Sequence, residues 1–134
     1  MTGRIMVVND QLVAATLLGI MLERNGFTVL RIDDAVTALD VIAEFIPDVF
    51  VINASLSGTN GIELCRQIRT QPQSARTPVI ILTSRGDMKK IEQGFEAGAN
   101  ECLIQPILSH DLMKAIQRVL HNIGSKTHVT AERI

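Results

Sequence analysis

The chain has 134 residues, the length of one ordinary domain, and carries 13 basic and 14 acidic residues for a net charge of −1. With no basic run and neither Trp nor Tyr, it lacks the charge pattern and the stacking surface typical of nucleic-acid binding. The apolar runs are far shorter than a membrane span, and residues 1–4 lead directly into a strand-like run, so we expect a cytoplasmic protein with neither a signal peptide nor a membrane segment.

Strand-like and helical patterns alternate through the first third of the chain. Residues 5–8 form an apolar run that predicts a strand, residues 27–32 are interpreted as a second strand, and a helix over residues 11–25 lies between them, closed by Gly26. This helix carries apolar residues at helical spacing: Val13, Leu17, Ile20 and Met21. Asp33 and Asp34 can cap the next helix. Its apolar face consists of Ala35, Ala38, Leu39, Ile42 and Phe45.

A third strand over residues 49–52 has no polar break, which is typical of the central strand of a parallel sheet. It stops at Asn53, and small and polar residues follow until Gly61. Ligands of open α/β sheets bind at the carboxyl ends of the central strands, so Asn53 is expected at the floor of a site. An amide there is neither a nucleophile nor an anionic metal ligand.

The second half continues the alternation. Residues 61–70 predict a helix with Ile62, Cys65 and Ile68 inward. The polar residues 71–77 are a loop, and the strand over residues 79–82 ends at Thr83 and Ser84. Cys65 and Cys102 lack metal-type spacing and are expected as small core residues of a reduced protein.

Two more helices and a short strand complete the pattern. Asp87 can cap a helix that buries Met88, Ile91 and Phe95 and ends at Gly98. A short strand over residues 102–104 precedes Gln105 and Pro106. Ser109 caps a last helix with a wide apolar band that reaches Ile123 and stops at Gly124. We therefore expect one domain over residues 1–124, a parallel sheet covered by helices on both faces, and a polar tail or linker over residues 125–134.

Three landmarks occur in order: VVND ending the first strand, PDVFVIN followed by Asn60-Gly61, and the pair VIILTS and GANECLIQP. With them, residues 4–124 resemble a response-regulator receiver domain of two-component signalling. The resemblance implies a flavodoxin-like (βα)5 fold with a doubly wound, five-stranded parallel sheet in the order 2-1-3-4-5. It also implies a cis peptide bond before Pro106.

The family's phosphorylation site maps onto an altered set of residues. The acidic pair is Asn9 and Asp10, the acceptor position is Asn53, the hydroxyl is Thr83, the lysine position is Gln105, the switch aromatic is Cys102 and the loop proline is Ser57. The acceptor carboxylate is therefore absent, and the chain resembles an atypical pseudo-receiver.

The missing carboxylates and the missing lysine of the site are consistent with each other. Mg²⁺ prefers charged oxygen ligands, and only Asp10 remains to supply one, so we expect no metal or cofactor and no catalytic residue. A carboxylate at Asp10 is more readily explained as a helix cap. An unpaired, partly buried ammonium at position 105 would be costly; Gln105 removes that cost and can hydrogen-bond Asn53 or Thr83.

The leading hypothesis is therefore a phosphorylation-independent adaptor, not an enzyme, that acts by protein–protein contact. The resemblance implies a protein partner, either a histidine kinase or a downstream regulator, and a homodimer face on the fourth helix, fifth strand and fifth helix. That face would include Met88, Lys89, Lys90, Glu92 and Arg118, with rim ion pairs to Glu96 and Glu101. Two alternatives stay open: a regulatory domain of a longer regulator with a DNA-binding part, and an active receiver that uses another carboxylate or Ser55.

Overall fold

The structure is a computed structural model that describes residues 2–56, 58–84 and 88–121. Five parallel strands form its sheet: β1 (Gly3–Val8), β2 (Phe27–Ile32), β3 (Val49–Asn53), β6 (Val79–Ser84) and β7 (Glu101–Gln105). Their order is β2-β1-β3-β6-β7. This confirms the predicted order 2-1-3-4-5 once a short antiparallel hairpin of β4 (Ser55–Leu56) and β5 (Thr59–Asn60) is set aside. The hairpin falls in a segment predicted as a loop.

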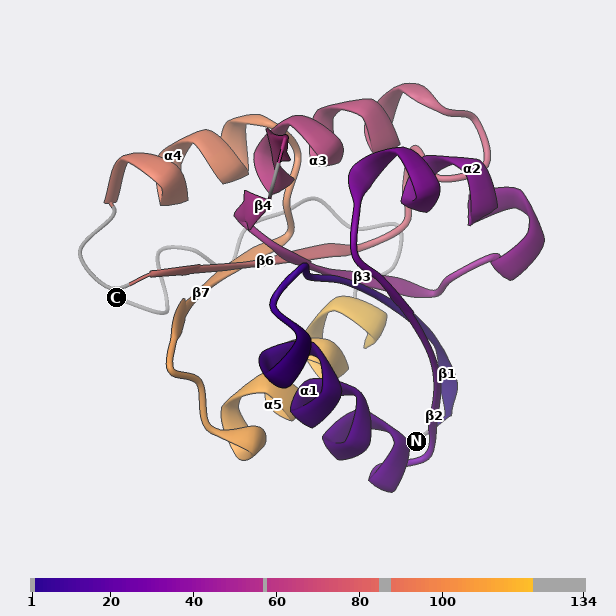
Figure 1. Ribbon diagram of the computed structural model, residues 1–134, viewed down its shortest axis with the longest axis vertical. Helices are drawn as coiled ribbons and strands as arrows, with labels where there is room; N and C mark the ends of the chain where they lie inside the picture. Colours follow the sequence, from indigo (N-terminus) through magenta and orange to yellow (C-terminus); the bar gives the residue numbers. More distant parts are fainter. Residues whose placement is uncertain (1, 57, 85–87, 122–134) are drawn as a thin grey trace.

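Helices cover both faces of the sheet, as predicted. They are α1 (Leu12–Arg24), α2 (Ala35–Phe45), α3 (Gly61–Thr70), α4 (Met88–Glu96) and α5 (Ser109–His121). In Figure 1, α2, α3 and α4 lie above the sheet, and α1 and α5 lie below it. The predicted cap at Asp87, the end of the last helix at Gly124 and the polar tail fall outside the described residues.

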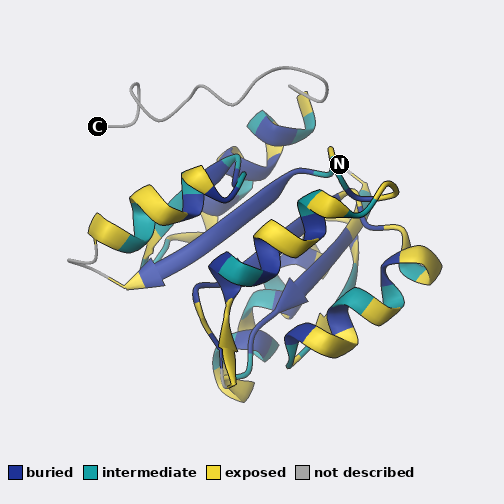
Figure 2. Ribbon diagram, turned by 90° about the horizontal axis from the view of Figure 1, so that it is seen from above, coloured by how far each residue is buried: buried dark blue, intermediate teal, exposed yellow. Residues whose placement is uncertain are grey.

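The central strands form the interior of the domain. Every residue of β3 is buried, and Figure 2 shows strands in dark blue between helices whose outer faces are yellow. Alternate residues point to opposite faces of the sheet. Met6, Phe50 and Ile81 therefore pack toward α2 and α3, in one apolar cluster. Ile5 and Val51 pack in the other cluster, with α1 and α5.

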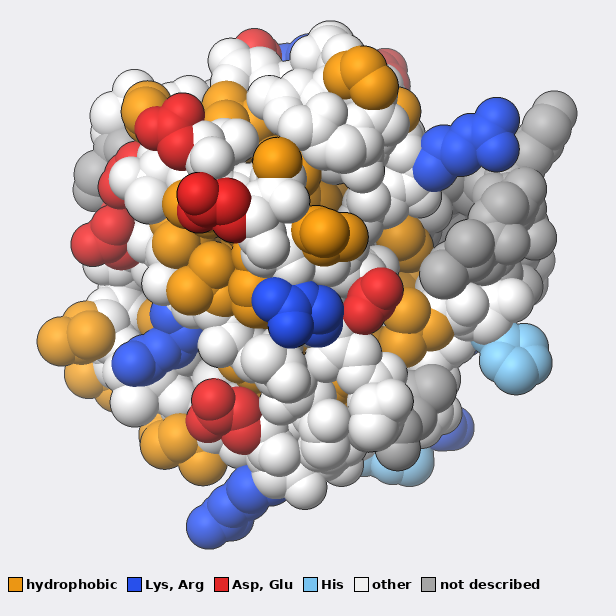
Figure 3. All heavy atoms as spheres, turned by 90° about the vertical axis from the view of Figure 1, so that its right-hand side faces the viewer, with side chains coloured by type: hydrophobic (Ala, Val, Ile, Leu, Met, Phe, Trp, Pro, Cys, Tyr) orange, Lys and Arg blue, Asp and Glu red, His pale blue; other side chains and the backbone are white. Residues whose placement is uncertain are grey.

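The helix α1 forms as predicted, but most of the apolar residues whose spacing predicted it lie outside its buried face. Its buried residues are Ala15, Gly19 and Leu22, whereas Val13, Leu17 and Ile20 are 72%, 63% and 45% exposed. The helix is apolar all round, so its periodicity does not indicate which side faces the sheet. Met88, predicted as core, is likewise 65% exposed. Figure 3 shows hydrophobic side chains at the surface on the side where β2 and α2 lie.

An ion pair joins the last strand to the last helix. The predicted pairing of Arg118 with Glu101 is confirmed, but it is not at an exposed rim, because the side chain of Glu101 is completely buried in β7. Arg118 of α5 donates to it through Nε at 3.2 Å and Nη2 at 3.3 Å. A buried carboxylate requires such a partner, so this pair helps to hold α5 against the edge of the sheet.

Candidate functional site

Three of the predicted site residues meet at the carboxyl edge of the sheet. Asn9 follows β1, Asn53 ends β3, and Thr83 lies near the end of β6, and these three strands are neighbours. Their exposed fractions are 4%, 6% and 2%, respectively. The topology thus forms a buried polar group at the position where doubly wound folds place ligands.

Asn9 and Asn53 contact each other through neutral amides. Asn53 Nδ2 donates to Asn9 Oδ1 at 3.4 Å. The same oxygen accepts a shorter bond of 2.9 Å from the backbone N–H of Gln11. The amide oxygen of Asn9 is therefore engaged twice, once in positioning the start of α1. The loop after Asn53 is packed close: a Cβ at Gly61 would collide with the carbonyl oxygen of Asn53.

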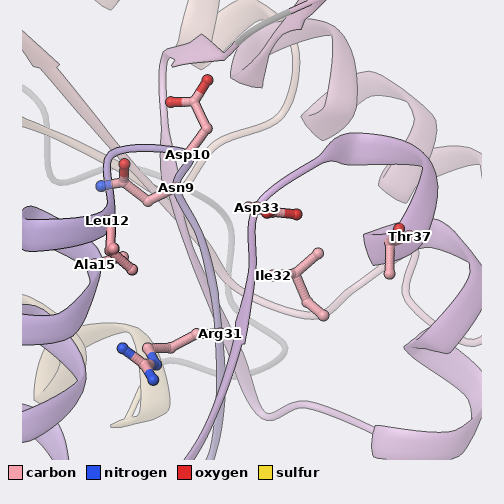
Figure 4. Close-up of a pocket in the computed structure, with 8 residues that line it drawn as sticks. All are labelled: Asn9, Asp10, Leu12, Ala15, Arg31, Ile32, Asp33 and Thr37. Atoms are coloured by element: carbon pink, nitrogen blue, oxygen red, sulfur yellow. The ribbon is translucent and has the colours of Figure 1, made fainter.

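Asp10 is not the cap of α1 that the sequence predicted. The cap residue of α1 is Gln11, whose side chain makes no capping bond. Asp10 lines a hollow of about 320 Å³ between the starts of α1 and α2. In Figure 4 its carboxylate is directed away from Leu12 and Ala15. Within the described residues, no group of three or more His, Cys, Asp or Glu side chains is placed to hold a metal ion.

Thr83 and Gln105 are not joined to the amide pair. Thr83 Oγ1 is buried without a hydrogen-bond partner, the one such side-chain atom in the described part of the chain. Gln105 ends β7, and its side chain forms no hydrogen bond to Asn53 or Thr83, so the expected contact is absent. The peptide bond between Gln105 and Pro106 is cis, as the resemblance predicted.

The switch-aromatic position is occupied by a thiol packed beneath α4. Cys102 Sγ lies 3.7 Å from the carbonyl oxygen of Ile91, and Gly94 leaves the space for it, since a Cβ there would lie 2.8 Å from the sulfur. Burial raises the pKa of Cys102 to about 12 and that of Cys65 to about 11. Both thiols are therefore protonated at neutral pH; Cys65 is buried, and Cys102 is partly buried.

One contact at the rim of the site was not predicted. Lys90 Nζ of α4 donates to Ser55 Oγ of β4 at 3.0 Å. It ties α4 to the segment that follows the acceptor position. The two residues are 35 positions apart, and no local pattern relates them, so only the folded chain reveals this contact.

The comparisons with known proteins agree with this geometry. Residues 5–117 match the family model of the response regulator receiver domain. The chain belongs to that family.

Among curated proteins, the chain is 36% identical over 123 residues to the phosphate regulon transcriptional regulatory protein PhoB of Rhizobium meliloti, covering 90% of this chain and 53% of that protein. It is 32% identical to the DNA-binding response regulator MtrA of Mycobacterium tuberculosis, covering 87% of this chain and 50% of that protein. The chain thus spans about half the length of these relatives.

Solved structures show the same fold over almost their whole length. A putative response regulator from Chloroflexus aurantiacus superposes with a TM-score of 0.87 at 30% identity, covering 90% of this chain and 99% of that one. The chemotaxis response regulator CheY4 of Vibrio cholerae gives 0.82 at 25% identity, covering 89% and 99%. In the described residues, no helix is both long and apolar enough to span a membrane.

Proposed function

We propose that this receiver domain signals without phosphorylation and acts as an adaptor through protein–protein contact. The observation that supports this is the contact between Asn53 Nδ2 and Asn9 Oδ1, where a phosphoacceptor site needs carboxylates. An amide is a poor nucleophile and cannot form an acyl phosphate. The sheet edge therefore keeps the form of a receiver site without its reactive group.

The side chains at this site also disfavour the binding of Mg²⁺. Metal binding here would depend on Asp10, because the amide oxygen of Asn9 already accepts two hydrogen bonds. Mg²⁺ is bound through one or two carboxylates plus waters and substrate phosphates, and it dehydrates reluctantly. We propose that Asp10 alone holds the ion too weakly for a resident metal.

The α4–β7–α5 surface is the proposed contact for a protein partner, either a histidine kinase or a downstream regulator. It exposes Met88 at 65%, Ile104 at 41% and Leu108 at 71%. Exposed apolar side chains flanked by charged groups such as Lys89 are typical of protein interfaces. With no phosphoryl group for Thr83 to contact and a thiol instead of an aromatic ring at Cys102, this surface lacks the family's Thr–aromatic switch.

The test is capture of the partner from the native host with the purified protein, identified by mass spectrometry. We expect the same partner with and without acetyl phosphate pretreatment, and with an Asn53→Ala variant. Met88→Glu, which changes an exposed residue, should reduce the capture. A partner captured only after acetyl phosphate treatment would contradict the proposal.

A second candidate is a regulatory domain of a longer response regulator. The relatives named above are about twice as long as this chain, and the name of MtrA describes it as DNA-binding. An antibody against residues of this domain distinguishes the two candidates, because a native polypeptide of about twice the mass would favour the second one.

A further inference from the structure

The helix α4 has fewer buried residues than the other helices of the domain. In the described part of the chain its one buried residue is Gly94, which has no side chain, whereas each of the other four helices buries three or more residues. Most of the stability of a helix in a protein comes from packing of its apolar face. The position of α4 therefore depends more than that of the other helices on contacts at its two ends.

The C-terminal end of α4 is attached by several hydrogen bonds. The backbone N–H of Ala99 donates to the carbonyl oxygen of Gly94 at 3.0 Å, which closes the turn after the helix. The guanidinium of Arg69 donates to the carbonyl oxygen of Gly98 through Nε at 3.0 Å and through Nη2 at 2.8 Å. It also donates to the carbonyl oxygen of Thr77, just before β6, at 2.6 Å. These bonds tie the end of α4 to α3 and to the start of β6.

The first turn of α4 is joined to the edge of the sheet by Lys90, whose Nζ donates to Ser55 Oγ at 3.0 Å. Ser55 belongs to a segment that is itself held in place. The backbone N–H of Ala54 donates to the carbonyl oxygen of Leu82 in β6, and the N–H of Gly61 donates to the carbonyl oxygen of Ala54, both at 2.8 Å. In Figure 1, α4 and β4 lie on the same side of β6. The contact thus joins the beginning of α4 to a fixed part of the site.

We propose that the hydrogen bond between Lys90 and Ser55 is a latch that sets the position of the first half of α4, with the Arg69 contacts at the other end as the pivot. When the bond is intact, α4 lies against β4. When it breaks, the start of α4 is free to move away from the edge of the sheet. Met88 is 65% exposed and lies two positions before Lys90, so this motion displaces an apolar residue of the α4–β7–α5 surface. The latch needs no phosphoryl group, and its effect on a partner rests on the proposed function.

Hydrogen–deuterium exchange of the full chain, measured by mass spectrometry, tests the latch. One exposed hydrogen bond contributes little, so we expect a shift in population and not a locked helix. Ser55→Ala removes the acceptor and should accelerate exchange of the amides of residues 92–96 in α4 by about three- to tenfold. Exchange in α1 and α5, which lie on the other side of the sheet, should stay unchanged.

Two matched variants serve as controls. Ser55→Thr keeps a hydroxyl oxygen at this position and should retain the exchange rates of the natural chain. Thr59→Ala removes a hydroxyl from the neighbouring strand β5 and should leave α4 unchanged, because the Thr59 side chain forms no hydrogen bond with the described residues.

Unchanged exchange of α4 in Ser55→Ala would overturn the proposal. An equal acceleration in every helix would overturn it as well, because it would indicate a general loss of stability. Neither result bears on the proposed function, which the Met88→Glu variant tests separately by capture of the partner.

Discussion

Replacing Thr83 with Val tests whether the buried hydroxyl at the site lacks a hydrogen-bond partner. Thr83 is 2% exposed, and its Oγ1 makes no hydrogen bond. Valine has nearly the same shape and no polar atom. The substitution therefore removes the desolvation cost of the hydroxyl without opening a cavity.

The expected effect is a gain in the free energy of unfolding. An unsatisfied buried polar group costs about 1–3 kcal/mol, and replacement by an apolar group of the same shape is neutral or stabilising. We take the lower end, about 1 kcal/mol, because the strand end lies near solvent. For a domain of this size that corresponds to a rise of about 3–5 °C in Tm.

The assay is urea unfolding followed by circular dichroism, with Ser74→Ala as a control of opposite sign. Ser74 is 1% exposed, and its Oγ donates to the carbonyl oxygen of Ile68 at 2.8 Å. Its loss should therefore destabilise the protein by about 1 kcal/mol. If Thr83→Val destabilises by as much as the control does, the hydroxyl has a partner and the reasoning fails.

Three further predictions concern the surroundings of the site. Gly94→Ala should lower the free energy of unfolding by about 1–2 kcal/mol, because its Cβ would lie 2.8 Å from Cys102 Sγ. The loss should be smaller in a Cys102→Ala background, and a double-mutant cycle in urea measures this coupling. Additive losses would contradict the contact. Arg118→Ala should destabilise by about 3 kcal/mol, since it removes a partner of the buried Glu101; an unchanged urea midpoint would contradict this. Both thiols should react with Ellman's reagent only on unfolding, because burial raises the pKa of Cys65 to about 11 and that of Cys102 to about 12. The thiols of the unfolded chain ionise at lower pH, so the free energy of unfolding should fall as the pH rises from about 9 toward 11. Rapid reaction of the folded protein at pH 8 would contradict this prediction.

The sheet and most of the site were predictable because they depend on local patterns. The unbroken apolar run before Asn53 indicates a buried strand and a site at its carboxyl end, and the resemblance to the receiver family added Asn9 and Thr83 to that site. The cap of α3 follows the same local logic, since Asn60 Oδ1 accepts from the backbone N–H of Glu63. The cis bond before Pro106 rested on the family resemblance instead.

The features that the sequence did not indicate depend on contacts between residues far apart in the chain. Glu101 reads as a surface residue, and only its pairing with Arg118, 17 positions later, explains its burial. Arg69, near the end of α3, makes contacts that no local pattern indicates. In the structure its guanidinium donates to the carbonyl oxygens of Gly98 and Thr77 and to Asn100 Oδ1, at 2.6–3.0 Å. Partners so distant in sequence leave no periodic signal.

The inward face of α1 was unpredictable for a different reason. Small residues such as Ala15 and Gly19 face the sheet because the helix packs close to it and beneath the Arg31 side chain. The larger apolar residues then remain outside. A hydrophobicity pattern ranks the larger residues as buried, so it indicates the wrong side of this helix.

The most direct test of the central claim is intact-mass spectrometry after incubation with acetyl phosphate and Mg²⁺. An Asn9→Asp, Asn53→Asp, Gln105→Lys variant restores the family's charged groups and serves as the positive control. We expect the unmodified mass for the natural chain and the mass of one added phosphoryl group for the variant. A stoichiometric phosphoryl adduct on the natural chain would contradict the account, whichever residue carried it.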